Sequence, residues 1–466
     1  MSAPQHVAVI DIGKTNAKLA LVDLDSLTEL AVITRPNTVL PGPPYPHFDC
    51  DGHWAFLLQG LSVFHKQHRI DAISITTHGA GAALLAADGR LATPVLDYEH
   101  DFPAAVVAAY DAIRPDFSET GSPRLAQGLN LGAQLHYLMT TDPGLRGRTA
   151  QIVTYPQYWA HRLTGVLATD LTSMGCHTDL WNPHLGGFSG LVDRLGIADI
   201  LAPARQSTEI LGPILPAIAA ATGLRPNTPV ACGIHDSNAS LLPHLISQSP
   251  PFSVVSTGTW VVVMTVGGAE ITLDPTRDTL INVNAFGQPI PSARFMGGRE
   301  YDLMRGQGAA FPSAEDVQHV LDTPLFLLPS AEPATGPFQG KAHRWTPTAP
   351  PATDPKRDVA LASYLALMTA ECLGITGANG QVIVEGPFAR NRLYLSMLAA
   401  ATGRPVTAAT SQTGTAIGAA LLFADRTCAP SGRASTPSTP SDPKMIRYAQ
   451  QWRAAVGYWP NSVSKP

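Results

Sequence analysis

The segment 7–23, VAVIDIGKTNAKLALVD, places two apolar runs on either side of a polar turn that contains one glycine. Its residues 13–15, GKT, match the end of a Walker A phosphate loop, but that motif needs a glycine five residues before Gly13, where Ala8 stands. The interval 8–12 contains four apolar residues and one acid, which is typical of a buried strand and not of a flexible loop. We therefore predict a strand, a tight turn at Gly13 and a second strand, and we exclude a P-loop nucleotide enzyme.

The composition predicts a soluble, cytoplasmic protein of more than one domain. A chain of 466 residues is too long for one core, so two or three domains are expected. Charged residues make up only 14%, against about 25% on average, and the net charge is -5, which argues against a nucleic-acid partner. No stretch approaches the ~18 apolar residues of a membrane span, and the N-terminus lacks a signal-peptide pattern. The five cysteines are scattered without a CxxC pair, which favours reduced thiols.

Apolar strand-like runs alternate with helical patterns along the chain, which favours an α/β fold. The segment 252–264, FSVVSTGTWVVVM, repeats the pattern of 7–23, with Gly258 aligned on Gly13. We predict two halves that each begin with a strand-turn-strand hairpin, with a boundary near the Pro-rich 247–252. A chance match of two short segments is the alternative.

Four glycine-containing turns follow strands, where a ligand can approach backbone amides closely. The first two are 11–16 and 256–259, between which a polyphosphate would meet amides, hydroxyls and the Lys14 ammonium. The third, 233–237, presents Asp236 where a strand passes into a helix, and the fourth, 385–391, enters a helix. The alternatives are ordinary hairpin turns for the first two and a helix N-cap for Asp236.

A lone histidine, His78, follows a buried strand at 72–77. Its functional interpretation is a substrate contact, and its alternative is a hydrogen-bonded structural histidine.

Six segments, in order along residues 7–424, together resemble the FGGY family of carbohydrate kinases in the sugar kinase/Hsp70/actin superfamily. VAVIDIGKTNAK resembles the family's first phosphate loop, YPQYWAHRLTG resembles a further family segment, and GIHDSNAS resembles the segment that carries the catalytic aspartate. VVSTGTW resembles the second phosphate loop, VEGPFARNRLYLSMLAAATGRPV resembles the adenosine segment, and GTAIGAALL resembles the closing helix. The overall pattern resembles the rhamnulokinase and fuculokinase branches.

The resemblance implies an α/β fold of two ribonuclease-H-like, actin-like ATPase domains with an interdomain cleft. Residues 1–247 would be a sugar-binding domain, 248–425 a nucleotide-binding domain, and 426–466 a Ser/Thr/Pro-rich linker followed by a C-terminal helix. The implied reaction is ATP-dependent phosphorylation of a sugar hydroxyl, on a ketose or deoxyketose such as L-rhamnulose, L-fuculose or a pentulose. The expected partners are this sugar and ATP/ADP, and a homodimer is left open.

The resemblance also assigns roles to individual residues. Asp236 would be the general base, and Mg²⁺ would be held through waters by Asp11 and Asp236. The phosphates and adenosine of ATP would contact Asp11, Gly13, Lys14, Thr15, Asn16, Lys18, Ser256, Thr257, Gly258, Thr259, Gly386, Pro387 and Asn391. The sugar would contact His78 and Gly79, with Asp97, Tyr98, His100, Gln157, Tyr158 and Asp236 as further candidates.

Three residues depart from the family pattern. Lys14 replaces a small hydroxyl residue in the first loop, Gln157 stands where many members carry aspartate, and Glu385 replaces a glycine. These departures leave the identity of the acceptor open. A nucleotide-binding sensor and an acceptor-independent ATPase on the same fold are the alternative functions.

Overall fold

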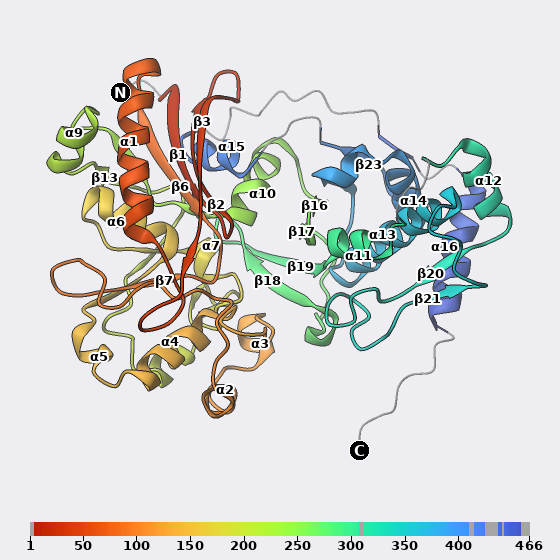
Figure 1. Ribbon diagram of the computed structural model, residues 1–466, viewed down its shortest axis with the longest axis horizontal. Helices are drawn as coiled ribbons and strands as arrows, with labels where there is room; N and C mark the ends of the chain where they lie inside the picture. The colour runs from red at the N-terminus through yellow and green to blue at the C-terminus, as the bar shows by residue number, and fades with distance from the viewer. Residues whose placement is uncertain (1–3, 307–310, 410–413, 425–436, 440–441, 458–466) are drawn as a thin grey trace. The chain divides into compact units, whose positions relative to one another are not determined.

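The computed structural model describes residues 4–306, 311–409, 414–424, 437–439 and 442–457 (Figure 1). The chain forms two compact units. The first contains Met1–Ser247, Ile281–Pro289 and Thr413–Pro430, and the second contains Gln248–Leu280, Ile290–Gln412 and Ser431–Pro466. The first break falls at the expected boundary after residue 247, but two segments expected in the second domain belong to the first unit.

A mixed sheet, with both parallel and antiparallel strand pairs, forms the centre of the first unit. Its strand order is β13-β14-β6-β1-β2-β3, and β15 also pairs with β6. The strands are β1 (His6–Ile12), β2 (Asn16–Asp23), β3 (Thr28–Pro36), β6 (Ala72–Thr77), β13 (Ile210–Pro213), β14 (Pro229–Ala231) and β15 (Ile234–His235). The β1–β2 hairpin is antiparallel and β6 runs parallel to β1, so the predicted strand-turn-strand at Gly13 is confirmed.

Alternation along β1 decides which helices cover each face of this sheet. Ile10 and Ile12 pack in the core formed with α1 (Cys50–His68) and α6 (Tyr155–Thr164). Val7 and Val9 pack in a second core with α10 (Asp236–Ser247) and α15 (Thr415–Ala420). The contact between α10 and α15 is close, because a Cβ on Gly418 would lie 1.8 Å from the carbonyl oxygen of Ala239. The expected closing helix therefore belongs to the core of the first unit.

Shorter elements complete the first unit. The helices are α2 (Ala104–Asp111), α3 (Phe117–Thr120), α4 (Leu131–Thr141), α5 (Leu145–Arg148), α7 (Leu171–Met174), α8 (Leu191–Arg194) and α9 (Pro216–Thr222). The strands are β4 (Val39–Leu40), β5 (His47–Phe48), β7 (Ala82–Leu85), β8 (Gln151–Thr154), β9 (Thr169–Asp170), β10 (Trp181–Asn182), β11 (Gly187–Phe188) and β12 (Ala204–Arg205).

The second unit repeats the central arrangement of the first. Its main sheet has the order β18-β19-β17-β16-β22-β23, in which β16 is antiparallel to β17 and parallel to β22, as β1 is to β2 and β6. The strands are β16 (Phe252–Thr257), β17 (Val261–Val266), β18 (Thr279–Val283), β19 (Pro289–Phe295), β22 (Gln381–Glu385) and β23 (Val406–Ala408), with β20 (Phe326–Leu328) and β21 (Arg344–Thr346) forming a separate pair. The predicted repeat of the opening hairpin is thus confirmed.

Helices α13 (Pro355–Ile375) and α14 (Arg392–Thr402) contribute many of the buried residues in the core of the second unit. Among the described residues, α13 alone is long and apolar enough to cross a membrane, but most of it is buried as a core helix. The C-terminal helix α16 (Pro443–Gly457) packs on this core, where the indole nitrogen of Trp452 donates to the Leu327 carbonyl at 2.8 Å. The other helices of the second unit are α11 (Gly297–Met304) and α12 (Ala314–Asp322), and its short 3₁₀ turns are η1 (Pro275–Arg277) and η2 (Pro387–Arg390). A third 3₁₀ turn, η3 (Leu421–Phe423), follows α15 in the first unit.

Candidate active site

The first glycine turn joins β1 to β2 and carries two charged residues. The Gly13 amide donates to the Asn16 carbonyl at 2.9 Å. Asp11 lies opposite Lys18 in the hairpin, with Nζ 3.7 Å from Oδ2. The pKa of Asp11 is raised to about 6, chiefly by burial and also by the nearby charge of Asp236, against the opposing effect of Lys18. Asp11 and Asp236 are therefore close enough to interact, as expected for residues that would share a cation.

Lys14 lies among residues that were expected at the sugar. Its ammonium is hydrogen-bonded to the Asp97 carboxylate and lies 3.0 Å from Oε2 of Glu99. It also lies 4.7 Å from the ring centroid of Tyr98 and 5.5 Å from that of Phe48. The Lys14 side chain is thus engaged by the acceptor candidates Asp97 and Tyr98, although the sequence placed it with the phosphates.

His78 follows β6 and lies inside an aromatic cluster. Its ring centroid is 5.1 Å from Phe48 and Tyr155 and 5.2 Å from Tyr98. Its Nδ1 lies 2.6 Å from the Gly79 carbonyl, so Nδ1 carries the hydrogen, and burial lowers the pKa of the ring so that it is neutral. Its Nε2 is then an acceptor, and this atom is buried without a partner among the described residues. A buried acceptor of this kind favours a hydroxyl donor from a ligand.

Asp236 begins α10 directly after β15. The Asp236 side chain is 35% exposed, and its Oδ1 accepts from the Ser237 amide at 2.6 Å and lies 3.1 Å from Nε2 of His235. An N-cap side chain would accept from an amide two or three residues further along, so this contact with the adjacent amide does not support the capping alternative. Within the described part of the chain, these contacts engage Oδ1 and leave Oδ2 to accept a proton.

His235 links Asp236 to a buried cysteine. Its Nε2 lies 3.9 Å from Sγ of Cys176, and a Cβ on Gly79 would lie 2.8 Å from the same nitrogen. Burial alone would lower the pKa of His235, but the charges of Cys176 and Asp236 raise it to about 9. Burial would likewise raise the pKa of Cys176, but the charges of His177 and His235 lower it to about 5. Cys176 and His235 thus form a buried, electrostatically coupled pair beside Asp236.

Three acceptor candidates lie outside this arrangement. Gln157 is fully buried, with Nε2 donating to the Cys232 carbonyl at 2.8 Å and Oε1 accepting from Thr154. Tyr158 lines a separate cavity with Arg162, which donates to its hydroxyl at 3.2 Å. His100 contacts Tyr137 edge-on, with Nε2 3.1 Å from the tyrosine hydroxyl. Their roles at the sugar stay predictions.

In the second unit, hydrogen bonds of Thr257 connect the second glycine turn to the expected adenosine segment. Its hydroxyl donates to the Glu385 carbonyl and accepts from the Phe388 amide at 3.1 Å. Gly386 crosses the end of β16 so closely that a Cβ there would lie 2.0 Å from the Thr257 carbonyl oxygen. The two segments therefore form one continuous surface.

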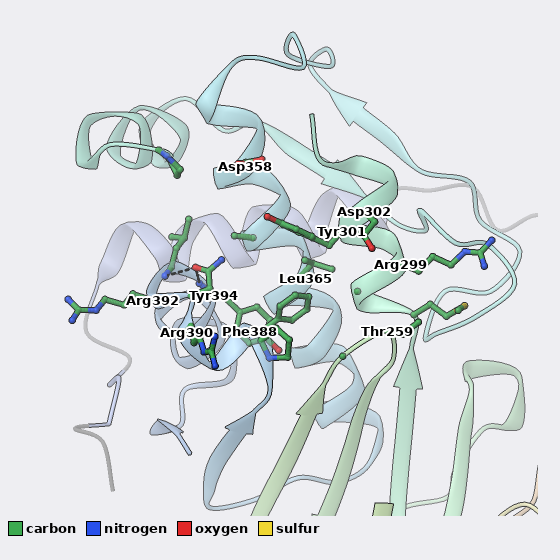
Figure 2. Close-up of a pocket in the computed structure, with 18 of the residues that line it drawn as sticks. Thr259, Arg299, Tyr301, Asp302, Asp358, Leu365, Phe388, Arg390, Arg392 and Tyr394 are labelled. Atoms are coloured by element: carbon green, nitrogen blue, oxygen red, sulfur yellow. Dashed lines mark hydrogen bonds between the residues drawn. The ribbon is translucent and has the colours of Figure 1, made fainter. Parts of the chain in front are cut away.

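A cavity of about 960 Å³ lies at this surface (Figure 2). Of the residues expected at the nucleotide, Gly258, Thr259, Pro387 and Asn391 line it, whereas Ser256, Thr257 and Gly386 are not among its lining residues. Asn391 also caps α14, because its side chain accepts from the Leu393 and Tyr394 amides. The volume is in the range of small-molecule and cofactor sites.

Sequence reasoning missed most of the cavity wall. Figure 2 shows Tyr301 and Asp302 on α11, Asp358 and Leu365 on α13, and Phe388 in the expected adenosine segment. The pattern GGRE at 297–300, which enters α11 after β19, is the one signal that could have indicated this wall. Residues on α13 follow an unbroken helical pattern and carry no such signal.

Asp11 and Asp236 are the two carboxylates that could hold a cation at the candidate site. Within the described ranges no group of three or more His, Cys, Asp or Glu side chains could hold a metal ion. Asp11 and Asp236 interact electrostatically and supply two carboxylates, which suits a Mg²⁺ ion that keeps most of its waters.

Known proteins resemble both units. The model of the N-terminal domain of the FGGY carbohydrate kinases matches residues 6–243, and that of the C-terminal domain matches 249–431. A carbohydrate kinase from Novosphingobium aromaticivorans is 36% identical, with a TM-score of 0.89 over 96% of this chain and 100% of that one. A ligand-bound xylulose kinase from Lactobacillus acidophilus, 16% identical with a TM-score of 0.79 over 97% of both chains, shares the fold.

Two curated relatives are more distant in sequence. An L-fuculokinase from Salmonella typhi is 26% identical over 270 residues, which is 56% of this chain and 57% of the relative, so this match spans little more than half of that protein. An autoinducer-2 kinase from Yersinia enterocolitica is 23% identical over 463 residues, or 89% of this chain and 85% of the relative.

With both domain models matched in order, this chain belongs to the FGGY family of carbohydrate kinases.

Proposed function

We propose that this protein transfers the terminal phosphoryl group of ATP to a hydroxyl group of a ketose or deoxyketose. The observation that carries the proposal is the placement of Asp236 at the start of α10, partly exposed and beside the aromatic cluster around His78. Family membership of both domains supports the same reaction.

Asp236 would accept the proton of the attacking hydroxyl through Oδ2. Nε2 of His235 lies 3.1 Å from the other oxygen, and this contact would help to orient the carboxylate. General-base catalysis of this kind contributes about 10²–10⁴-fold to the rate. The remaining rate enhancement would come from positioning and from neutralisation of phosphate charge.

The acceptor would lie against the aromatic cluster. Its C–H face would pack on the ring of Tyr98, and one hydroxyl would donate to the free Nε2 of His78. This mixture of an apolar wall and few polar groups suits a deoxy sugar, whose missing hydroxyl exposes more apolar surface.

The nucleotide would occupy the cavity of the second unit. Tyr301 and Phe388, whose ring centroids lie 6.2 Å apart, would supply aromatic surface for a base, and Arg390 would supply positive charge. Asp11 and Asp236 would hold Mg²⁺ through waters, and the ion would offset the negative charge of the phosphates. The turn at Gly13 and its counterpart at Gly258 would bind the phosphates with backbone amides.

The relatives indicate which acceptors to test first. Because an L-fuculokinase and a xylulose kinase are among the similar proteins, ketoses and deoxyketoses are the first acceptors to test. An autoinducer-2-type acceptor is a second candidate, because the match with the Yersinia enterocolitica autoinducer-2 kinase spans most of both proteins. ATP as the donor also leads us to propose the cytoplasm as the site of action.

The test is ADP release from ATP and Mg²⁺ against a panel of ketoses, deoxyketoses, aldoses, polyols and autoinducer-2. Stimulation by one acceptor, with a phosphorylated product, is the expected result. Nucleotide binding without stimulation by any acceptor would favour a sensor. Steady ADP release without an acceptor would favour an ATPase and contradict the proposal.

A further inference from the structure

Five neighbouring residues form what we call the Lys14 cluster: Lys14, Phe48, Asp97, Tyr98 and Glu99. The ammonium is bonded to the Asp97 carboxylate, lies 3.0 Å from Glu99 and packs over both aromatic rings. A cation shared by two carboxylates and two ring faces is strongly fixed in place.

The Lys14 cluster adjoins the place proposed for the acceptor. The rings of Phe48 and Tyr98 each lie within 5.2 Å of the His78 ring, centroid to centroid. His78 is only 7% exposed, and its Nε2 has no partner among the described residues. The charge of Lys14 also acts on His78. An acceptor bonded to Nε2 would therefore lie in the field of Lys14 and its two acidic partners.

The Lys14 cluster carries one positive and two negative charges. Asp97 is 6% exposed, so its charge is poorly screened by solvent, whereas the Glu99 side chain is 57% exposed and is screened more. Moving Lys14 toward the phosphates would leave the Asp97 carboxylate buried without its cation, which is costly. Lys14 is thus already neutralised and is not available to an anionic substrate.

We propose that Lys14, Asp97 and Glu99 select the charge of the acceptor, admitting neutral ketoses and rejecting acidic sugars of the same length, such as aldonates and ketoaldonates. The proposal rests on the proposed function and defines its substrate class. Asp97 and Glu99 accept hydrogen bonds from acceptor hydroxyls and repel a carboxylate, so selectivity comes from a repulsive element as well as from attraction.

The test compares kcat/KM for neutral ketoses and for acidic sugars of matched length in the full-length protein. The variants are Asp97→Asn, Glu99→Gln and Lys14→Met. The matched controls are Asp199→Asn and Glu209→Gln, which remove a carboxylate from the surface pairs with Arg146 and Arg205.

Opposite shifts are expected from the two kinds of variant. Each acid-to-amide change should raise the acidic-to-neutral ratio of kcat/KM, by at least about tenfold for Asp97→Asn and less for the screened Glu99→Gln. Lys14→Met should lower the same ratio. The controls should leave it unchanged. Added salt should weaken the discrimination of the wild-type protein.

Two outcomes would overturn the inference while leaving a sugar kinase intact. One is a wild-type preference for acidic sugars. The other is a ratio that stays constant in Glu99→Gln and Asp97→Asn while both substrates lose rate together, since a purely structural role has that effect. If no acceptor of either charge stimulates ADP release in the wild-type protein, the proposed function itself fails and the inference fails with it.

Discussion

Replacement of Gly386 by alanine should break the junction between the second glycine turn and the adenosine segment. Gly386 has φ 81° and ψ -161°, a region that is essentially restricted to glycine. A Cβ would also lie 2.0 Å from the Thr257 carbonyl oxygen, whereas real Cβ contacts essentially never fall below 3.0 Å. The two segments would have to separate by about 1 Å.

The expected size of the effect follows from these two terms. The backbone conformation alone should lower the free energy of unfolding by about 1–3 kcal/mol. A displacement of about 1 Å in a binding surface can cost about 100-fold in rate, so we expect a comparable loss in kcat/KM for ATP. Steady-state kinetics with varied ATP, nucleotide titration calorimetry and urea unfolding would measure the changes in kcat/KM, nucleotide affinity and stability separately.

Gly403→Ala is the matched control. Gly403 ends α14 with φ 69° and ψ 19°, but a Cβ there would meet nothing within 4 Å. This variant should lose about 1 kcal/mol of stability from the left-handed conformation and keep normal nucleotide affinity. If Gly386→Ala behaved like Gly403→Ala in both assays, the argument from close approach would be refuted.

Three further predictions concern single side chains. Asp236→Asn should lower the transfer rate about 10²–10⁴-fold and leave nucleotide binding largely intact in calorimetry; near-normal turnover would remove it as the base. Thr257→Val removes the hydrogen bonds that the Thr257 hydroxyl makes with the Glu385 carbonyl and the Phe388 amide, so the free energy of unfolding should fall by about 1–3 kcal/mol and nucleotide should bind more weakly; unchanged affinity would exclude the loop from the site. Burial raises the pKa of Glu300 to about 7, so its protonation contributes stability that is complete below pH 4.5 and is lost as the pH rises through 7. Urea unfolding at pH 5 and pH 7 would measure how much stability is lost between the two pH values. This loss should be smaller in Glu300→Gln than in the wild type, by at most about 3 kcal/mol. An equal loss in both proteins would contradict burial of Glu300 as the cause.

Local patterns predicted the strands and turns that carry the candidate site. The apolar runs around Gly13 and Gly258 each formed a hairpin, because alternation and a turn glycine act within a dozen residues. Asp236 was placed correctly at a strand-to-helix junction for the same reason.

Long-range contacts account for what sequence reasoning missed. Lys14 reaches Asp97, 83 residues further along, and so contacts a residue expected at the acceptor, whereas its own expected role at the phosphates stays a prediction. Cys176 meets His235 across 59 residues. Neither contact has a periodicity or a turn residue to mark it. Tertiary packing alone determines such neighbours.

The division of the chain into two units has a practical consequence for anyone who wishes to express them separately. A fragment that stops at residue 247 would lack Val283, which packs against Gly175, and would lack α15, which covers Ala239. Apolar core surface would then face water, and aggregation would be expected. A soluble first unit would require the 281–289 and 414–424 segments to be grafted back through new linkers, because both segments follow residue 247 in the chain but belong to the first unit.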